Sequence, residues 1–195
     1  MKKNIRGYAK DYGLYLSKLL NKIDYSSVED VIQCFLDARA RSSGIFFIGN
    51  GGSAATAAHF AQDLAEVGRK TGSTGFKTSA LTSNVAQITA LANDYSYEDI
   101  FTGQMKDVFQ KNDLLVAISA SGNSANIVKA VNYAQELGGI TIGLVGFDGG
   151  KLKGLCDYIL HVKTPAGEYG PVEDMHMIFD HMITSYLHMK LKASK

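Results

Sequence analysis

The 195-residue sequence predicts a three-layer, doubly wound α/β domain with a five-stranded parallel sheet and an N-terminal helical extension. Three observations lead to this prediction. Five short apolar runs, rich in β-branched and aromatic residues, follow residue 44, and helical segments separate most of them. Runs that are apolar throughout are typical of parallel strands, because helices cover both faces of such a sheet. The first 41 residues contain no such run and show helical spacing of apolar side chains instead.

The N-terminal extension is expected to form two helices. Ser26, with Glu29 three residues later, has the pattern of a capping box that would begin the second helix. The first helix has more apolar side chains than a helix covering one small sheet needs, so residues 1–43 are expected to take part in oligomerisation. In this helix the apolar side chains recur at helical spacing: Tyr8, Tyr12, Tyr15, Leu16, Leu19, Leu20 and Ile23.

Strands and helices alternate through the rest of the chain. The strands are expected at Ile45–Gly49, Thr78–Leu81, Leu114–Ser119, Ile140–Gly146 and Tyr158–Val162. The helices are expected at Ala54–Val67, Val85–Ala92, Asp99–Phe109, Ala125–Leu137 and Val172–Leu191. Because no linker, repeat or low-complexity tract interrupts this pattern, residues 1–195 are expected to form one domain whose α/β core spans residues 44–195.

Composition excludes several classes of protein. The chain has 20 Lys+Arg against 19 Asp+Glu, a formal net charge of +1, so no excess of positive charge favours binding to nucleic acid or to a membrane surface. No uncharged apolar run reaches the roughly 18 residues of a membrane span, and the N-terminus lacks the apolar segment of a signal peptide. Cys34 and Cys156 form no CxxC pair and lie in apolar surroundings, which indicates buried free thiols in a reducing compartment. A cytoplasmic protein is therefore expected.

A glycine-rich loop follows the first predicted strand. The stretch GNGGS places Asn50, Gly51, Gly52 and Ser53 between this strand and the next helix. Glycine permits close approach of an oxygen ligand, and the free N–H groups and dipole of a helix start favour an anion. Taken alone, such a stretch can equally be an ordinary turn.

A second loop strengthens the interpretation. The stretch SASGNS also ends a predicted strand and begins a helix, and it presents the hydroxyls of Ser119, Ser121 and Ser124. Ligands bind where the C-terminal ends of parallel strands meet, so two hydroxyl-rich helix starts can converge there on one phosphate. Neither loop has a P-loop or dinucleotide-binding motif, which favours a terminal phosphate on a small molecule. The alternative is that the serines only cap their helices.

Two predicted helices carry possible metal ligands. His59 and Asp63 are four residues apart, so they share a helix face and could bind one divalent ion, for which zinc is a natural choice. On the last helix, Glu173 and His181 diverge by about 80° around the axis. Periodicity alone therefore favours a ligand stripe of Glu173, His176 and Asp180. His161 and His188 are expected to be structural or solvated.

The motifs together resemble the sugar isomerase (SIS) domain family and, within it, the phosphoheptose isomerases. The resemblance covers nearly the whole chain and rests on GNGGS, SxSGNS, HFAQD, LANDYSYEDIF and GFDGGKL. It implies a flavodoxin-like SIS fold, a homotetramer and active sites at subunit interfaces. It also implies conversion of D-sedoheptulose 7-phosphate to D-glycero-D-manno-heptose 7-phosphate through an enediol, to supply heptose for lipopolysaccharide or capsule.

The resemblance also implies roles for individual residues. One Zn²⁺ per subunit would be held by His59, Asp63, Glu173 and His181, and Asp63 and His181 would form the acid–base pair. Asn93 and Asp94 could equally form a turn between elements. The substrate would be bound by Asn50, Gly51, Gly52, Ser53, Asn93, Asp94, Ser119, Ser121, Ser124 and Glu173.

The sequence departs from the family pattern at several positions. Asp63 stands where the family usually has glutamate, which shortens its reach by about 1.5 Å. Glu173 replaces a glutamine, Ala120 replaces a frequent threonine, and residues 168–174 approach the last helix differently. Two alternatives therefore stay open: a non-catalytic SIS protein that binds phosphosugars or a protein partner, and an isomerase of another sugar phosphate. The carboxylate at position 63 and the presence of His181 favour catalysis.

Overall fold

The computed structural model describes residues 4–193 and confirms the predicted fold class. Five parallel strands form one sheet in the order β2-β1-β3-β4-β5. Their C-terminal ends share one edge, and β1 and β3 are neighbours at its centre. The strands are β1 (Gly44–Gly49), β2 (Lys77–Ala80), β3 (Leu114–Ser119), β4 (Ile140–Gly146) and β5 (Tyr158–Val162).

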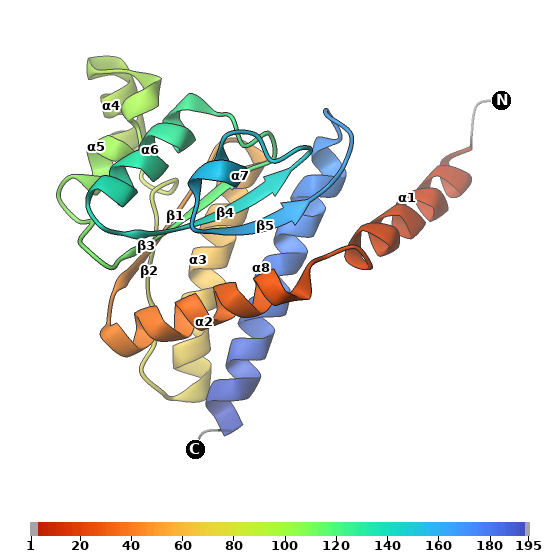
Figure 1. Ribbon diagram of the computed structural model, residues 1–195, viewed down its shortest axis with the longest axis horizontal. Helices are drawn as coiled ribbons and strands as arrows, with labels where there is room; N and C mark the ends of the chain where they lie inside the picture. Colours follow the sequence, from red (N-terminus) through yellow and green to blue (C-terminus); the bar gives the residue numbers. More distant parts are fainter. Residues whose placement is uncertain (1–3, 194–195) are drawn as a thin grey trace.

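Alternate side chains along each strand enter two separate cores. In β1, Phe47 packs toward one helix layer, whereas Phe46 and Ile48 pack toward the other. The first layer contains α2 (Tyr25–Arg41), α3 (Gly52–Thr71) and α8 (Tyr169–Ala193), as Figure 1 shows. The second contains α4 (Val85–Asp94), α5 (Thr102–Met105), α6 (Ala125–Glu136) and α7 (Leu152–Leu155). Helices on both faces explain why the strands are apolar throughout.

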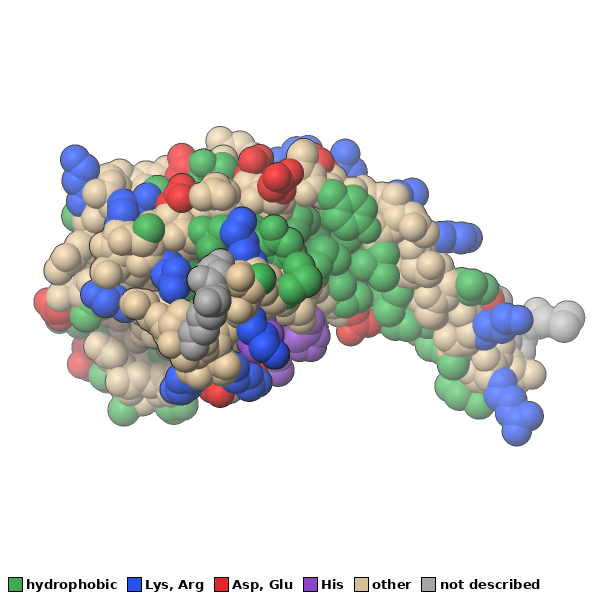
Figure 2. Space-filling model, turned by 90° about the horizontal axis from the view of Figure 1, so that it is seen from below, with side chains coloured by type: hydrophobic (Ala, Val, Ile, Leu, Met, Phe, Trp, Pro, Cys, Tyr) green, Lys and Arg blue, Asp and Glu red, His purple; other side chains and the backbone are tan. Residues whose placement is uncertain are grey.

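Helix α1 (Ile5–Leu20) projects away from the body of the molecule (Figure 1). Its last turn buries Leu19, while Ile5, Tyr8 and Leu14 are exposed. Hydrophobic side chains cover much of the surface where this arm meets the body (Figure 2). Two tyrosines tie the arm to the start of α8, because the Tyr12 hydroxyl donates to Asp174 at 2.5 Å and the Tyr15 hydroxyl donates to Glu168.

The expected capping box at Ser26 is wrong. Helix α2 begins at Tyr25, and its N-cap is Asp24, two residues before Ser26. The Asp24 carboxylate accepts hydrogen bonds from the Ser26 amide at 3.1 Å and from the hydroxyls of Ser26 and Ser27. The serines therefore serve as donors to an aspartate cap, which is itself a preferred residue at this position.

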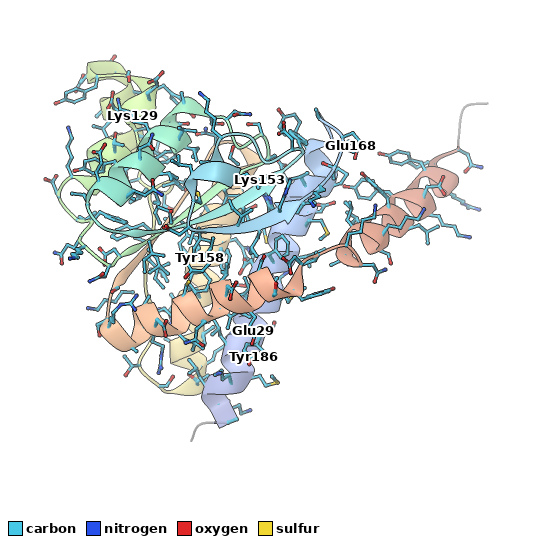
Figure 3. The ribbon with its side chains drawn as sticks, viewed as in Figure 1. Glu29, Lys129, Lys153, Tyr158, Glu168 and Tyr186 are labelled. Carbon is cyan, nitrogen blue, oxygen red and sulfur yellow. The ribbon has the colours of Figure 1, made fainter. Side chains whose placement is uncertain are left out.

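The continuous helix expected at Asp99–Phe109 is also wrong. The structure has a 3₁₀ turn at Tyr97–Asp99 followed by the four-residue α5. Asp99 pairs at 2.7 Å with Lys129 of α6, which is labelled in Figure 3. Gly103 lies so close to Leu91 that a Cβ atom would come within 2.5 Å of it. These tertiary contacts hold the 3₁₀ turn against α6 and the short α5 against α4.

The remaining general expectations concern thiols and membranes. Cys34 is buried, Cys156 is partly buried, and both are free. Burial raises the pKa of both thiols, that of Cys156 to about 12, so both are unreactive at neutral pH. Across residues 4–193, none of the helices combines the length and apolar character needed to span a bilayer.

Candidate active site

The two predicted loops meet at the centre of the sheet edge. Asn50–Ser53 follows β1, and Ser119–Ser124 follows the neighbouring β3. Helix α3 leaves the first loop toward one face, and α6 leaves the second toward the other, so the loops flank the crevice where doubly wound folds bind ligands. Residues from both loops and from α8 line a cleft of about 150 Å³: Asn50, Ser53, Ile118, Ser119, Ala120, Ser121, Ser124, Tyr169 and Glu173.

Gly122 is the glycine on which the second loop depends. Its φ is +63°, and a Cβ atom there would lie 2.1 Å from the carbonyl oxygen of Gly149. The Ser119–Ser124 loop therefore packs directly on the turn that follows β4. This contact explains why two distant motifs, SASGNS and GFDGG, both contain glycine.

A pair of asparagines links the two loops. Asn50 and Asn126 exchange two hydrogen bonds, each 2.9 Å long, and the Tyr97 hydroxyl donates to the Asn50 side chain at 3.1 Å. Asn126 is buried and was not expected at the site. It lies two residues inside α6, and no local pattern in the sequence reveals its partner. The Asn50 amide, expected to bind substrate, thus also holds the loops together.

Glu173 belongs to the same cleft. Its carboxylate lies beside the backbone of Gly52, where a Cβ atom would come within 2.5 Å of a carboxylate oxygen. Gly52 is the first residue of α3, and the N–H groups and dipole of a helix start stabilise a carboxylate. Glu173 therefore occupies the anion-favouring end of α3, which explains the need for glycine at position 52.

A second group of side chains lies farther along α3 and α8, which pack side by side (Figure 1). His59 Nε2 is 3.3 Å from His181 Nε2, 3.4 Å from Asp63 Oδ2 and 3.9 Å from Asp180 Oδ2. All four ligand atoms lie within 4.8 Å of one another. Three of the four expected metal ligands are thus brought together, with Asp180 in the place expected for Glu173.

The two buried members of the polar stripe on α8 differ in their surroundings. His176 is fully buried outside this group, and burial lowers its pKa to about 4, so the ring is neutral. The structure thus favours His181 over His176 as a ligand. Asp180 is also fully buried, but it faces His59. Burial, and to a smaller extent the nearby Asp63 carboxylate, raise the pKa of Asp180 to about 7.

The other expected site residues lie elsewhere. Asn93 and Asp94 end α4 in the opposite helix layer, where their exposed side chains bond to each other at 2.8 Å. His161 is half-buried and contacts the carbonyl oxygen of Phe147 at 3.0 Å, in agreement with a structural role. His188 lines, with Asp63 and Lys70, a hollow of about 290 Å³ between α3 and α8.

Comparison with known proteins identifies relatives that share the sequence and the fold. The model of the SIS domain family matches residues 7–146. The chain is 43% identical over 148 residues to a phosphoheptose isomerase of Aliarcobacter butzleri, covering 75% of this chain and 76% of the relative. It is 39% identical over 153 residues to one from Helicobacter pylori, covering 78% of each. A solved phosphoheptose isomerase from Neisseria gonorrhoeae superposes with a TM-score of 0.84 at 28% identity, over 94% of this chain and 96% of the other.

Proposed function

The chain belongs to the phosphoheptose isomerases of the SIS domain family, and from this premise we propose that it interconverts D-sedoheptulose 7-phosphate and D-glycero-D-manno-heptose 7-phosphate. The observation that carries the proposal is the arrangement of two polar groups along α3. A hydroxyl-lined cleft lies at the start of this helix, and a group of histidines and carboxylates lies farther along it. The first suits a phosphate, and the second suits proton transfer at the other end of a sugar.

The spacing of the two groups fits a long sugar chain. Ser53 precedes His59 by six residues, which corresponds to about 9 Å along a helix axis. Six C–C bonds of about 1.5 Å span roughly 7–8 Å when extended, and the phosphate ester adds to this length. An open-chain heptose phosphate therefore reaches from the serine cleft to the histidine group. A three-carbon phosphate does not.

We propose that the phosphate binds mainly to the Ser119–Ser124 loop. The Glu173 carboxylate already occupies the start of α3, and like charges repel at short range. The other wall of the cleft is free to bind an anion. It presents the hydroxyls of Ser121 and Ser124 and the N–H groups at the start of α6. Asn50 and Ser53 would then face the hydroxyl groups of the sugar.

The reacting end would lie at His59, Asp63 and His181. Their imidazole and carboxylate groups suit Zn²⁺ or another divalent ion, and such an ion would polarise the ketose carbonyl and stabilise the enediolate. Asp63 takes a proton from C1 and returns it to C2, while His181 transfers the hydroxyl proton from O1 to O2. The Asp63 side chain is 34% exposed, so it is open to a bound sugar.

We propose that the enzyme is a homotetramer with active sites at subunit interfaces. The cleft of about 150 Å³ is smaller than the roughly 300–1,000 Å³ of complete ligand sites. Exposed apolar residues on α1 offer a surface for another subunit. Asn93 and Asp94 are exposed and lie outside the cleft of their own subunit, so they would contact the sugar only in such an assembly. The enzyme would act in the cytoplasm and supply heptose phosphate for lipopolysaccharide or capsule.

Direct assay of the zinc-loaded protein in D₂O tests the proposal. With sedoheptulose 7-phosphate, NMR should show an aldose phosphate labelled with deuterium at C2, because the carbon-bound proton exchanges at Asp63. Six-carbon and five-carbon ketose phosphates, assayed in parallel, test the alternative of another sugar. A folded, metal-loaded protein that binds these ketose phosphates and turns over none of them would instead be a phosphosugar-binding regulator.

A further inference from the structure

We propose that Asp180 is a ligand of the divalent ion, so that His59, Asp63, Asp180 and His181 hold it and Glu173 does not. The inference deepens the proposed function, since the ion would serve the same isomerase site. Two independent observations support it: the geometry of the four ligand atoms, and the burial of the Asp180 carboxylate without a partner.

The burial of Asp180 requires an explanation. The residue is 0% exposed, and neither carboxylate oxygen has a hydrogen-bond partner among residues 4–193. An unpaired buried carboxylate is destabilising by several kcal/mol, so buried charges are normally paired or bound to metals. No lysine or arginine within the described part of the chain forms an ion pair with Asp180, and its one possible ionic partner there is His59, at 3.9 Å. A cation between these groups would satisfy both.

The distances from His59 match those between ligands of one divalent ion. Zinc bonds of about 2.0–2.2 Å to nitrogen and oxygen place neighbouring ligand atoms roughly 3.3–3.6 Å apart. The three measured separations from His59 Nε2 are 3.3, 3.4 and 3.9 Å. Two facing imidazole nitrogens and two carboxylates thus surround a space of the right size. Asp180 approaches from the buried side, and the exposed His59 and His181 approach from the surface.

Glu173 lies outside the group whose ligand atoms are within 4.8 Å of one another. Its carboxylate contacts Gly52, which precedes His59 by seven residues on α3. That separation corresponds to about 10 Å along the helix axis, so the Glu173 carboxylate lies nearer the start of α3 than the histidine group does. We therefore assign the fourth ligand to the Asp180 carboxylate, and Glu173 remains part of the cleft. Two carboxylates and two neutral imidazoles balance the charge of a divalent ion.

Metal affinity, measured without substrate, tests the assignment. The full-length protein and the variants Asp180→Asn, Asp180→Leu and Glu173→Gln would be titrated with Zn²⁺ against a chromogenic chelator. We expect both Asp180 variants to lose more than about 100-fold in affinity, since even the outer partners of metal ligands contribute roughly 10- to 100-fold. Glu173→Gln, which also removes one carboxylate charge from α8, should keep the wild-type affinity. In the Co²⁺ form, the d–d absorption should change in Asp180→Asn and stay unchanged in Glu173→Gln.

Thermal unfolding separates ligation from a structural role. In the metal-free protein, Asp180→Leu should raise the melting temperature by a few degrees, because it removes an unpaired buried carboxylate. If Asp180 were purely structural, Asp180→Leu would lower the melting temperature of the metal-free protein. The inference is overturned if Glu173→Gln loses the metal while Asp180→Asn retains it, or if the wild type binds no divalent ion. A separate assay of isomerase activity distinguishes failure of the ligand assignment from failure of the proposed function. Metal binding that depends on Asp180, without turnover of any sugar, would overturn the proposed function and leave the ligand assignment intact.

Discussion

The Nε2 atoms of His59 and His181 lie 3.3 Å apart across α3 and α8, although 122 positions separate the two residues. This distance is close to that between two ligands of one tetrahedral zinc ion. It depends on two long helices that start at the same edge of the sheet and run side by side (Figure 1). The parallel course of α3 and α8 therefore creates the histidine and carboxylate group from residues that are unremarkable on each helix alone.

Replacing the proposed acid–base pair should abolish most of the isomerase activity. At saturating zinc, Asp63→Asn and His181→Gln are each expected to lower kcat by about 10²- to 10⁴-fold, because each removes a group that transfers a proton in the transition state. Steady-state assays with sedoheptulose 7-phosphate measure the change, with bound zinc quantified in each sample. Glu136→Gln, at the exposed end of α6, is the control and should keep wild-type kcat. Activity retained in both variants would exclude these roles.

Removing the charge of Glu173 should strengthen phosphate binding. Its carboxylate shares the cleft with the serine loop and repels an anion, so Glu173→Gln should lower the Kd for inorganic phosphate several-fold. Ser124→Ala should raise that Kd by about tenfold, as expected for a lost hydrogen bond to a charged group. Isothermal titration calorimetry measures both, with Glu136→Gln at the exposed end of α6 as the control. A weaker affinity in Glu173→Gln would show that this carboxylate supports the anion indirectly.

The Asn50–Asn126 pair should be energetically coupled. Each alanine substitution removes both hydrogen bonds between the two side chains and leaves the partner amide only partly satisfied, so each should destabilise the fold by about 1–3 kcal/mol. The double variant should cost less than the sum of the single variants by roughly 1 kcal/mol. Urea unfolding gives the three values, and Asn21→Ala, which removes an exposed side-chain hydrogen bond on α1, should change stability by less than about 0.5 kcal/mol. Strict additivity would mean that the pair contributes nothing to joining the loops.

Stability should depend on pH through His176. Its folded-state pKa of about 4 lies below the ordinary histidine value of 6.5, so the unfolded chain binds the proton more readily. The stabilisation from a neutral ring is complete above pH 6.5 and is lost as the pH falls toward 4, by up to about 3 kcal/mol.

The variant His176→Leu isolates this effect. Neither ring nitrogen of His176 has a well-formed hydrogen bond within residues 4–193, although the nearby Val145 backbone partly offsets the effect of burial on its pKa. An apolar side chain of similar size should therefore not lower stability at pH 7. Between pH 6.5 and 4, the variant should lose less stability than the wild type when unfolding is followed in urea. If the stabilities of the two proteins fell in parallel with pH, groups other than His176 would be responsible for the loss of stability in acid.

Local patterns in the sequence predicted the features that depend on neighbouring residues. Period and composition located all five strands and the long helices, because burial on a parallel sheet requires continuous apolar runs. The strand-to-helix loops were recognisable from their glycines and serines. Prediction failed in two short regions. The cap of α2 is Asp24 and not the predicted Ser26. The helix expected from residue 99 is interrupted, and Asp99 pairs with Lys129 there.

The choice between Glu173 and Asp180 lies beyond any local pattern. Both are acidic residues on the polar stripe of α8, and the spacing of residues along that helix does not tell which of them faces His59. The answer depends on how far α8 is shifted along α3, and that shift follows from side-chain packing between helices more than 100 residues apart in the chain. The sequence therefore established the fold, the two loops and the ligand types. The packing of α3 against α8 established that Glu173 contacts Gly52, and that Asp180 joins the histidines.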